Sequence, residues 1–188
     1  MRWFILAFAV VMASLSGPAL ALNVCDDLWF TRNLIFDRAG YCFASDLGQA
    51  IFDNTDCVEG EVELTARAEA LVALIRSDED GLQCRVDDTR TSLDIPEIPT
   101  RMLMEDLPIA TLYESACVGW LGDSLELRTA RNDEADVIGA AERGDALAFQ
   151  FQDEGAWSFV EVLGKDGLLG MGWAKVQIAE ENCVAIAG

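Results

Sequence analysis

Apolar residues recur at helical spacing in the first part of the chain and at strand spacing in the second. The first helical stretch starts at Leu28, where Asp26 or Asp27 can cap it. It is followed by Gly40, a residue that suits the left-handed conformation found after many helices. These signals predict an amphipathic helix over residues 28–39.

Two further stretches carry the same helical signals. Ser45 or Asp46 can cap a short helix, and Thr65 can cap a longer one that runs towards Cys84. Over residues 86–111 the periodicity is lost and prolines become frequent, which is typical of a linker. Apolar residues are common in this linker, so we expect it to pack along a domain.

The C-terminal part is divided into short runs of apolar and β-branched residues separated by glycine-containing turns. This pattern predicts strands and a small closed barrel. The fold class is therefore α+β, with a small disulfide-linked helical domain followed by a β-barrel. The expected strands lie at 125–128, 147–151, 157–162 and 172–176.

The first 21 residues have the features of a secretory signal peptide. Arg2 precedes an uncharged apolar run, and the residues at 19–21 fit a small-x-small cleavage site. The run is shorter than the roughly 20 residues that span a bilayer. We expect a periplasmic or secreted protein without a stable membrane span after cleavage, divided into 1–21, 22–85 (helical domain), 86–111 (linker) and 112–188 (barrel).

The composition excludes several functions. The chain has 33 acidic and 13 basic side chains and a formal net charge of −20, so nucleic acid would be repelled. It has no histidine, which excludes Ser-His-Asp or Cys-His catalysis and zinc bound by histidine. The acidic run at 78–81 lacks the ligand spacing of a calcium loop. We expect no metal, no cofactor and no nucleic-acid partner.

A resemblance to the bacterial YARHG domain, a small extracytoplasmic helical module, covers the first helical stretches. The matching residues are Leu28, Arg32, Asn33, Ile35, Arg38, Gly40, Tyr41, Phe43, Leu47 and Phe52. The eponymous Tyr and His are absent, so no role of that His is carried over. With its added cysteines, the chain resembles a family of secreted alphaproteobacterial proteins. For Arg32, Asn33 and Arg38 two interpretations stand: an anion site, or bonds to helix-end carbonyls and nearby Asp side chains, with Asn33 fixing a turn.

The motif order of the C-terminal part resembles a bacterial SH3 domain. The matching segments are 125–128, 137–139, 143–145, 157–160 and 172–174, while 129–131 departs from the usual loop sequence. The resemblance implies a groove that binds peptides or cell-wall fragments, although both tryptophans also suit a barrel core. The candidate ligand-binding residues are Trp157, Trp173, Asp133, Glu134, Asp136 and Asp153.

Export makes the six cysteines a disulfide framework. Cys117 and Cys183 bracket the expected barrel, whose ends should lie close together, so we expect them to pair. For the other four cysteines several pairings are open, and we favour Cys25–Cys57 and Cys42–Cys84.

These observations favour a non-catalytic binding or adaptor protein that uses its SH3-like domain. Its partner would be a peptide, a peptidoglycan fragment or a periplasmic protein. One alternative is a carboxylate-dependent cell-wall hydrolase, because glycosidases can work with two carboxylates. Another is a periplasmic inhibitor that blocks the active site of another protein.

Overall fold

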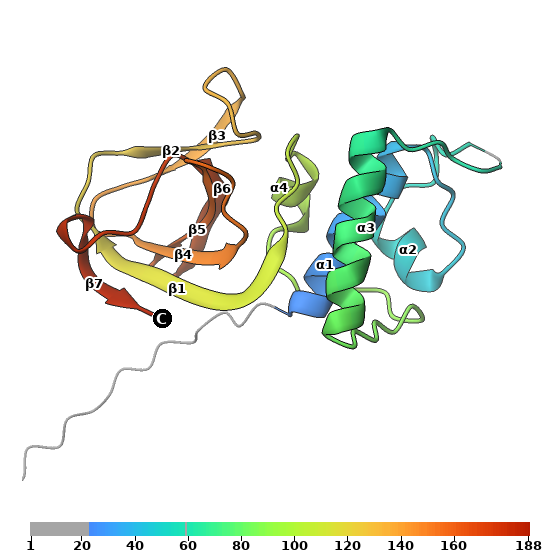
Figure 1. The fold of residues 1–188 in the computed structure, drawn as a ribbon, viewed down its shortest axis with the longest axis horizontal. Coiled ribbons are helices and arrows are strands. Elements are labelled where there is room, and N and C mark those ends of the chain that lie inside the picture. Colours follow the sequence, from blue (N-terminus) through green and yellow to red (C-terminus); the bar gives the residue numbers. More distant parts are fainter. Residues whose placement is uncertain (1–22, 59) are drawn as a thin grey trace, which may run out of the picture.

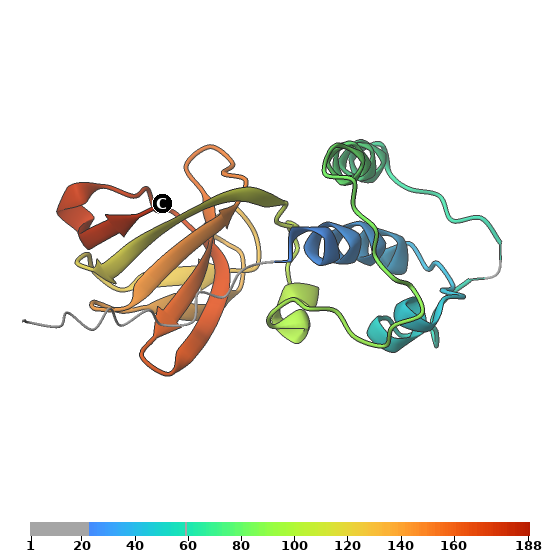
Figure 2. The ribbon, with the colours of Figure 1, turned by 90° about the horizontal axis from the view of Figure 1, so that it is seen from below.

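The computed structural model describes residues 23–58 and 60–188, so the predicted signal peptide lies outside the described residues. A helical part and a β-sheet lie side by side (Figures 1 and 2). Within the described ranges, no helix has the length and apolar character needed to cross a membrane. The helices are α1 (Val24–Arg38), α2 (Asp46–Ile51), α3 (Ala66–Gly81) and α4 (Ile98–Met102). The strands are β1 (Ala110–Trp120), β2 (Leu125–Arg128), β3 (Val137–Ala141), β4 (Ala146–Phe151), β5 (Ser158–Gly164), β6 (Gly167–Ala174) and β7 (Cys183–Ala187).

Helix α1 begins about one turn earlier than the sequence pattern predicted. Asn23 caps it by accepting a hydrogen bond from the main-chain nitrogen of Asp26 at 3.3 Å. Asp26 and Asp27 lie inside the first turn, so their predicted capping role is wrong. Gly40 follows the helix with φ of +86°, which confirms its predicted left-handed conformation.

Helices α1 and α3 pack against each other through apolar side chains. Leu28 and Ile35 of α1 contact the cluster that contains Val72 and Ile75 of α3. The predicted caps of α2 and α3 are confirmed, since each side chain accepts a hydrogen bond from a main-chain nitrogen three residues later. These caps are Ser45 and Thr65.

The connecting segment, residues 82–109, packs on the helical part, as its apolar content indicated. A cluster of aromatic side chains from α1 and the α2 region includes Phe30 and Phe52. Side chains of the connecting segment, among them Leu93 and Ile95, pack against this cluster. Within the predicted linker the chain also forms α4. The connecting segment is therefore part of the helical core.

Three disulfides link the chain. Cys117 pairs with Cys183 as predicted, across the neighbouring strands β1 and β7. The remaining pairs are Cys25–Cys84 and Cys42–Cys57, so the predicted pairs Cys25–Cys57 and Cys42–Cys84 are wrong.

The packing of the helices explains the observed pairs. Helices α1 and α3 are antiparallel, which places Cys25 at the start of α1 beside Cys84, just after α3. The loop around α2 is closed by a hydrogen bond from the nitrogen of Val58 to the carbonyl of Gly40 at 2.8 Å. This bond brings Cys42 next to Cys57.

The sheet is antiparallel, with seven strands in the order β3-β2-β6-β5-β4-β1-β7. The turn pattern predicted a closed barrel, but the sheet is open, with β3 and β7 at its edges. One edge of β1 pairs with β4 and the other with β7. Strand β7 pairs with the second half of β1, residues 116–120, and ends the sheet on that side.

Two apolar clusters lie on the sheet. Val160 and Val162 of β5 belong to one cluster, and Phe159 belongs to the other, because successive side chains of a strand point to opposite faces. The second cluster also contains Trp173 of β6 and Met104 of the connecting segment. It therefore joins the sheet to the helical part.

Candidate functional site

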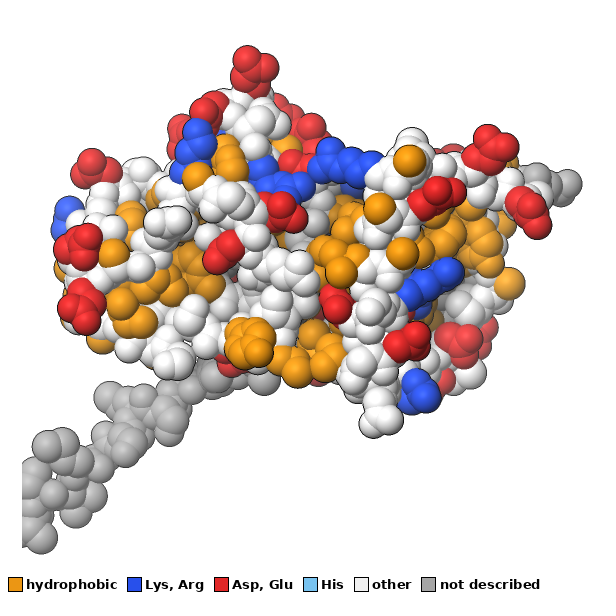
Figure 3. Space-filling model, viewed as in Figure 1, with side chains coloured by type: hydrophobic (Ala, Val, Ile, Leu, Met, Phe, Trp, Pro, Cys, Tyr) orange, Lys and Arg blue, Asp and Glu red, His pale blue; other side chains and the backbone are white. Residues whose placement is uncertain are grey.

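A cavity of about 730 Å³ lies where the helical part meets the sheet. Helices α1 and α3 supply an apolar wall that includes Ile35, Leu71 and Leu74. The connecting segment and the loops of the sheet supply a polar wall that includes Asp106 and Arg131. Figure 3 shows basic and apolar side chains next to each other along this junction. The volume falls within the roughly 300–1,000 Å³ typical of ligand sites.

Four side chains of alternating charge form a ladder along the polar wall. Arg67 on α3 contacts Asp106 at 2.8 Å. Asp106 contacts Arg131 at 3.3 Å, and Arg131 contacts Glu154 at 3.0 Å. The main-chain nitrogen of Arg131 also donates to Asp106 at 3.0 Å. The ladder connects α3 to the β2–β3 and β4–β5 loops beside the cavity.

The ladder counteracts the effect of burial on the pKa values of its two half-buried members, Asp106 and Arg131. Burial by itself raises the pKa of Asp106, but hydrogen bonds from Arg131 and the charges of Arg131 and Arg67 outweigh it and hold the pKa below its usual value. Burial likewise lowers the pKa of Arg131, and Asp106 and Glu154 outweigh it and raise this pKa. The Arg67 side chain is 78% exposed, so it stays accessible to a ligand.

Trp173, a predicted ligand-binding residue, is 1% exposed and belongs to the core. Its indole nitrogen donates to the carbonyl of Asp106 at 2.7 Å. The guanidinium of Arg131 lies over its ring, 4.9 Å from the centre. Trp173 therefore supports the polar wall of the cavity from beneath and offers no open ring to a ligand.

Trp157 lies in a separate polar cluster. The ammonium of Lys175 is 4.9 Å from the centre of its ring, and Lys175 donates to Asp133 at 2.6 Å. Trp157 packs on the same apolar cluster as Trp173 but does not line the cavity. The other predicted acids are exposed and lie outside the cavity lining: Glu134, Asp136 and Asp153.

Two polar residues of the YARHG-like pattern bind within the helical part. Arg32 donates to Glu79 through Nε at 2.9 Å and through Nη2 at 3.1 Å, which links α1 to α3. Asn33 donates to the carbonyl of Trp29 at 2.8 Å, one turn earlier in the same helix. Both residues therefore make structural contacts, but not the ones expected: Arg32 pairs with a Glu and not with an Asp or a helix-end carbonyl, and Asn33 bonds within α1 and does not fix a turn.

Arg38, the third polar residue of that pattern, has two roles. Its Nη2 donates to the carbonyls of Met102 at 3.1 Å and Met104 at 2.7 Å, at the end of α4. Burial lowers its pKa, which the charges of Asp37 and Glu105 partly oppose. Arg38 also lines the cavity, so a residue that binds helix-end carbonyls contributes to the candidate site. Tyr41 is exposed and packs edge-on against two phenylalanine rings.

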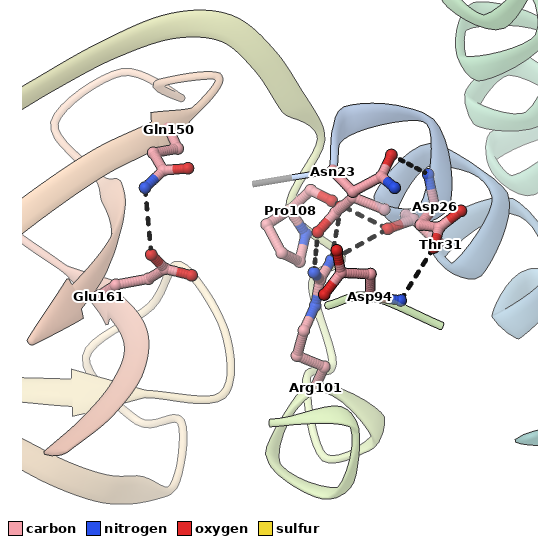
Figure 4. A network of polar contacts seen from close by, with 9 residues as sticks. Asn23, Asp26, Thr31, Asp94, Arg101, Pro108, Gln150 and Glu161 are labelled. Atoms are coloured by element: carbon pink, nitrogen blue, oxygen red, sulfur yellow. Dashed lines mark hydrogen bonds and ion pairs between the residues drawn. The ribbon is translucent and has the colours of Figure 1, made fainter. Parts of the chain in front are cut away.

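The sequence pattern did not predict a buried polar network at the junction of the helical part and the sheet (Figure 4). Arg101 of α4 donates through Nη2 to Asp27 at 2.9 Å and to Thr31 at 3.2 Å. Next to it, Asp26 accepts hydrogen bonds from Arg90 at 2.7 Å and from the main-chain nitrogen of Asp94 at 2.8 Å. A signal was present, because Asp27 and Thr31 lie one turn apart on a buried helix face, where an acid requires a cation.

Glu161 lies across the junction from this network, on β5, and is 1% exposed (Figure 4). Its Oε2 accepts a long hydrogen bond of 3.4 Å from Gln150. Burial raises the pKa of Glu161 to about 7, with Arg101 opposing and the charges of Asp27 and Glu114 adding to the rise. A pKa near neutrality suits a general acid. Glu161 does not line the cavity, however, so a ligand there would not reach it.

The geometry defines a two-part, disulfide-linked protein in which helices and an open antiparallel sheet share one cavity. Residues 83–188 match a domain of unknown function, DUF4453, and this match covers more than half of the chain. The chain belongs to the DUF4453 family. Residues 8–80 match the YARHG domain. No curated protein and no solved structure matches the chain.

The two matched regions meet at the end of α3, but they do not form two independent structural parts. The connecting segment belongs to the DUF4453 match, yet it packs on the helices of the YARHG match. The cavity is lined from both regions, with Leu71 from the first and Asp106 from the second. The candidate site therefore depends on both domains.

Proposed function

We propose that this protein is an exported, non-catalytic binding protein whose cavity accepts a peptide segment with apolar side chains and a carboxylate. The observation that carries the proposal is the combination of an apolar wall with the exposed guanidinium of Arg67 in one cavity. The apolar wall would take aliphatic side chains, and Arg67 would take the carboxylate.

The charges around the cavity support a ligand carboxylate. The chain as a whole carries a net charge of −20, yet three arginines line this cavity: Arg38, Arg67 and Arg131. Asp106 and Glu154 are already engaged by the ladder. Arg67 pairs with Asp106, but its side chain is 78% exposed against 19% for Arg131, so its charge is accessible to a ligand carboxylate.

We also propose that the protein is exported and that its sheet is related to SH3 domains. Three disulfides are consistent with an oxidising compartment, and the first 21 residues have the pattern of a signal peptide. The order of motifs over 125–174 supports a relation of the sheet to bacterial SH3 domains, and the cysteines added to the YARHG-like pattern support a relation to secreted alphaproteobacterial proteins. Peptides that combine methyl groups with carboxylates occur both in cell-wall stems and in protein segments.

The test is binding of the oxidised chain from Leu22 onward to soluble cell-wall stem peptides and to a library of acidic and neutral synthetic peptides. We expect saturable binding that Arg67→Ala and Leu74→Asp abolish. The matched controls are Arg143→Ala, an exposed arginine in the turn after β3, and Leu169→Asp, an exposed leucine of β6; both should bind normally. Binding that survives both cavity variants but is lost in Trp157→Ala would move the site to the Trp157 cluster.

The remaining outcomes separate the alternatives. Stem peptides and protein-derived peptides form two arms of the test, so the source of the carboxylate is identified. Release of soluble fragments from insoluble peptidoglycan would show a hydrolase instead. Capture of one stoichiometric periplasmic protein with inhibition of its activity would show an inhibitor. No binding in either peptide arm at low salt would overturn the proposal.

A further inference from the structure

Strand β7 (Cys183–Ala187) is an edge of the sheet that lacks the usual protection against pairing. One side of it pairs with β1, and no described strand pairs with the other side. The chain has 33 acidic side chains, but residues 183–188 contain no charge and no proline. Val184 is 70% exposed and Ile186 is 47% exposed. Natural sheets usually guard such an edge with charges, prolines or bulges.

The other edge of the same sheet provides a contrast. Strand β3 (Val137–Ala141) is preceded by a loop that contains Asp133, Glu134 and Asp136, and it is followed by Glu142 and Arg143. These charges flank β3 on both sides and oppose the approach of another strand. Neither β3 nor β7 carries a charged side chain within the strand, and Glu180 and Glu181 precede β7. The two edges differ on the other side, because Glu142 and Arg143 directly follow β3, whereas residues 183–188 carry no charged side chain.

The side chains of β7 are arranged as a palindrome of sizes around Ala185. The order is small, large, small, large, small, from Cys183 to Ala187. Two such strands that run antiparallel about a two-fold axis at Ala185 place Val184 opposite Ile186 of the second copy. All four large side chains then lie on one face, and the alanines lie on the other.

The main-chain groups of β7 fit the same register. The carbonyl of Asn182 accepts a hydrogen bond from the nitrogen of Leu121, just after β1, at 2.8 Å. Successive peptide groups of a strand point to opposite sides, so the N–H and C=O groups of Cys183, Ala185 and Ala187 point away from β1. In a two-fold pair centred on Ala185, these groups lie directly opposite their partners and can exchange hydrogen bonds.

We propose that two copies of this chain associate through β7, antiparallel about a two-fold axis at Ala185, to form one continuous sheet. This association is independent of the cavity and of its ligand. A five-residue strand buries less surface than the roughly 1,600 Å² of a standard stable interface, so the dimer is weak and depends on concentration. Each copy carries a net charge of −20, and salt screens this repulsion, so association strengthens as salt concentration rises.

Analytical ultracentrifugation of the oxidised chain from Leu22 onward, over a concentration series at low and high salt, tests the proposal. We expect a monomer–dimer equilibrium that shifts towards dimer at high salt. Ala185→Pro removes an N–H that points away from β1, so it should abolish the dimer and keep the β1–β7 pairing. Ile186→Lys adds a charge to the same strand and should also abolish the dimer.

The matched control is Leu169→Lys, which adds the same charge at another exposed residue of the sheet and should dimerise normally. Thermal unfolding checks that each variant is folded, and Ile186→Lys keeps the test valid if Ala185→Pro fails to fold. A monomer at every concentration and salt overturns the proposal. A dimer that persists in folded Ile186→Lys assigns the interface to another surface and overturns it as well.

Discussion

Arg101 and Asp27 form a buried ion pair at the junction of the two parts, with Nη2 of Arg101 2.9 Å from Oδ1 of Asp27. Both side chains are almost completely shielded from solvent. The guanidinium also lies 5.2 Å from the ring centre of Phe30 in α1 and 5.3 Å from that of Phe151 in β4. Arg101 therefore contacts the helical core and the sheet at once, and it is placed to fix their relative orientation.

Replacement of Arg101 by Met should destabilise the protein by about 3–5 kcal/mol, because Asp27 would be left buried without its cation. The double variant Arg101→Met with Asp27→Asn should lose less than the sum of the two single variants. Urea unfolding followed by tryptophan fluorescence measures each value. The control is Arg67→Met, which removes an exposed pair worth about 1 kcal/mol or less. Equal losses in Arg101→Met and Arg67→Met would show that the buried pair does not hold the junction.

Glu161 should make stability fall as pH rises towards neutrality. Its pKa is about 7 in the folded protein against an ordinary value of 4.5, so the folded state binds the proton more tightly than the unfolded state. Glu161 therefore contributes roughly 3 kcal/mol to the free energy of unfolding below pH 4.5, and this contribution is lost as the pH rises from 4.5 to 7.

Glu161→Gln removes this titration and tests it directly. Urea unfolding at pH 5 and pH 8 should show the variant gaining stability over the natural protein at pH 8, with a much smaller difference at pH 5. The chain has many other acidic groups, so the measured quantity is the difference between the two proteins at each pH. The same difference at both pH values would show that Glu161 does not titrate in this range.

The disulfide pairing predicts that removal of either of the two N-terminal disulfides lowers the stability of the protein, by different amounts. Cys25 and Cys84 are 59 residues apart, and Cys42 and Cys57 are 15 apart. In the loop-entropy description, removal of the first pair costs about 4 kcal/mol and removal of the second about 3 kcal/mol. Unfolding of the two double-alanine variants measures both losses. Peptide mass mapping without reduction should find Cys25 joined to Cys84, and a Cys25–Cys57 peptide would contradict the pairing.

The two candidate tryptophans should differ sharply in their effect on stability. Trp173→Ala removes a fully buried ring and its hydrogen bond to Asp106, which should cost about 3–5 kcal/mol. Trp157 is half-buried over a solvent-facing cluster, so Trp157→Ala should cost less than about 2 kcal/mol. Thermal and urea unfolding of both variants measure this. A stable, well-folded Trp173→Ala protein would show that its ring is dispensable to the core.

Local signals in the sequence predicted local structure well. Ser45 and Thr65 cap their helices, Gly40 takes the left-handed conformation, and the strand at 125–128 has the predicted bounds. The candidate site was predicted less well. The SH3-like pattern predicted Trp157 and Trp173 as ligand-binding residues, but the cavity lies between the two domains and is lined by residues from both.

The sequence by itself determined the three longer helical stretches with the caps of α2 and α3, most of the strands, the even set of cysteines and the acidic charge, because each follows from side chains close together in the chain. The tertiary structure decided which cysteines pair, that β7 takes the second edge of β1, that the sheet is open, and that Asp27 meets Arg101. It also decided that Arg67, Asp106, Arg131 and Glu154 form one ladder. These features depend on contacts between distant residues, whose partners are set by how whole elements pack and not by any local pattern.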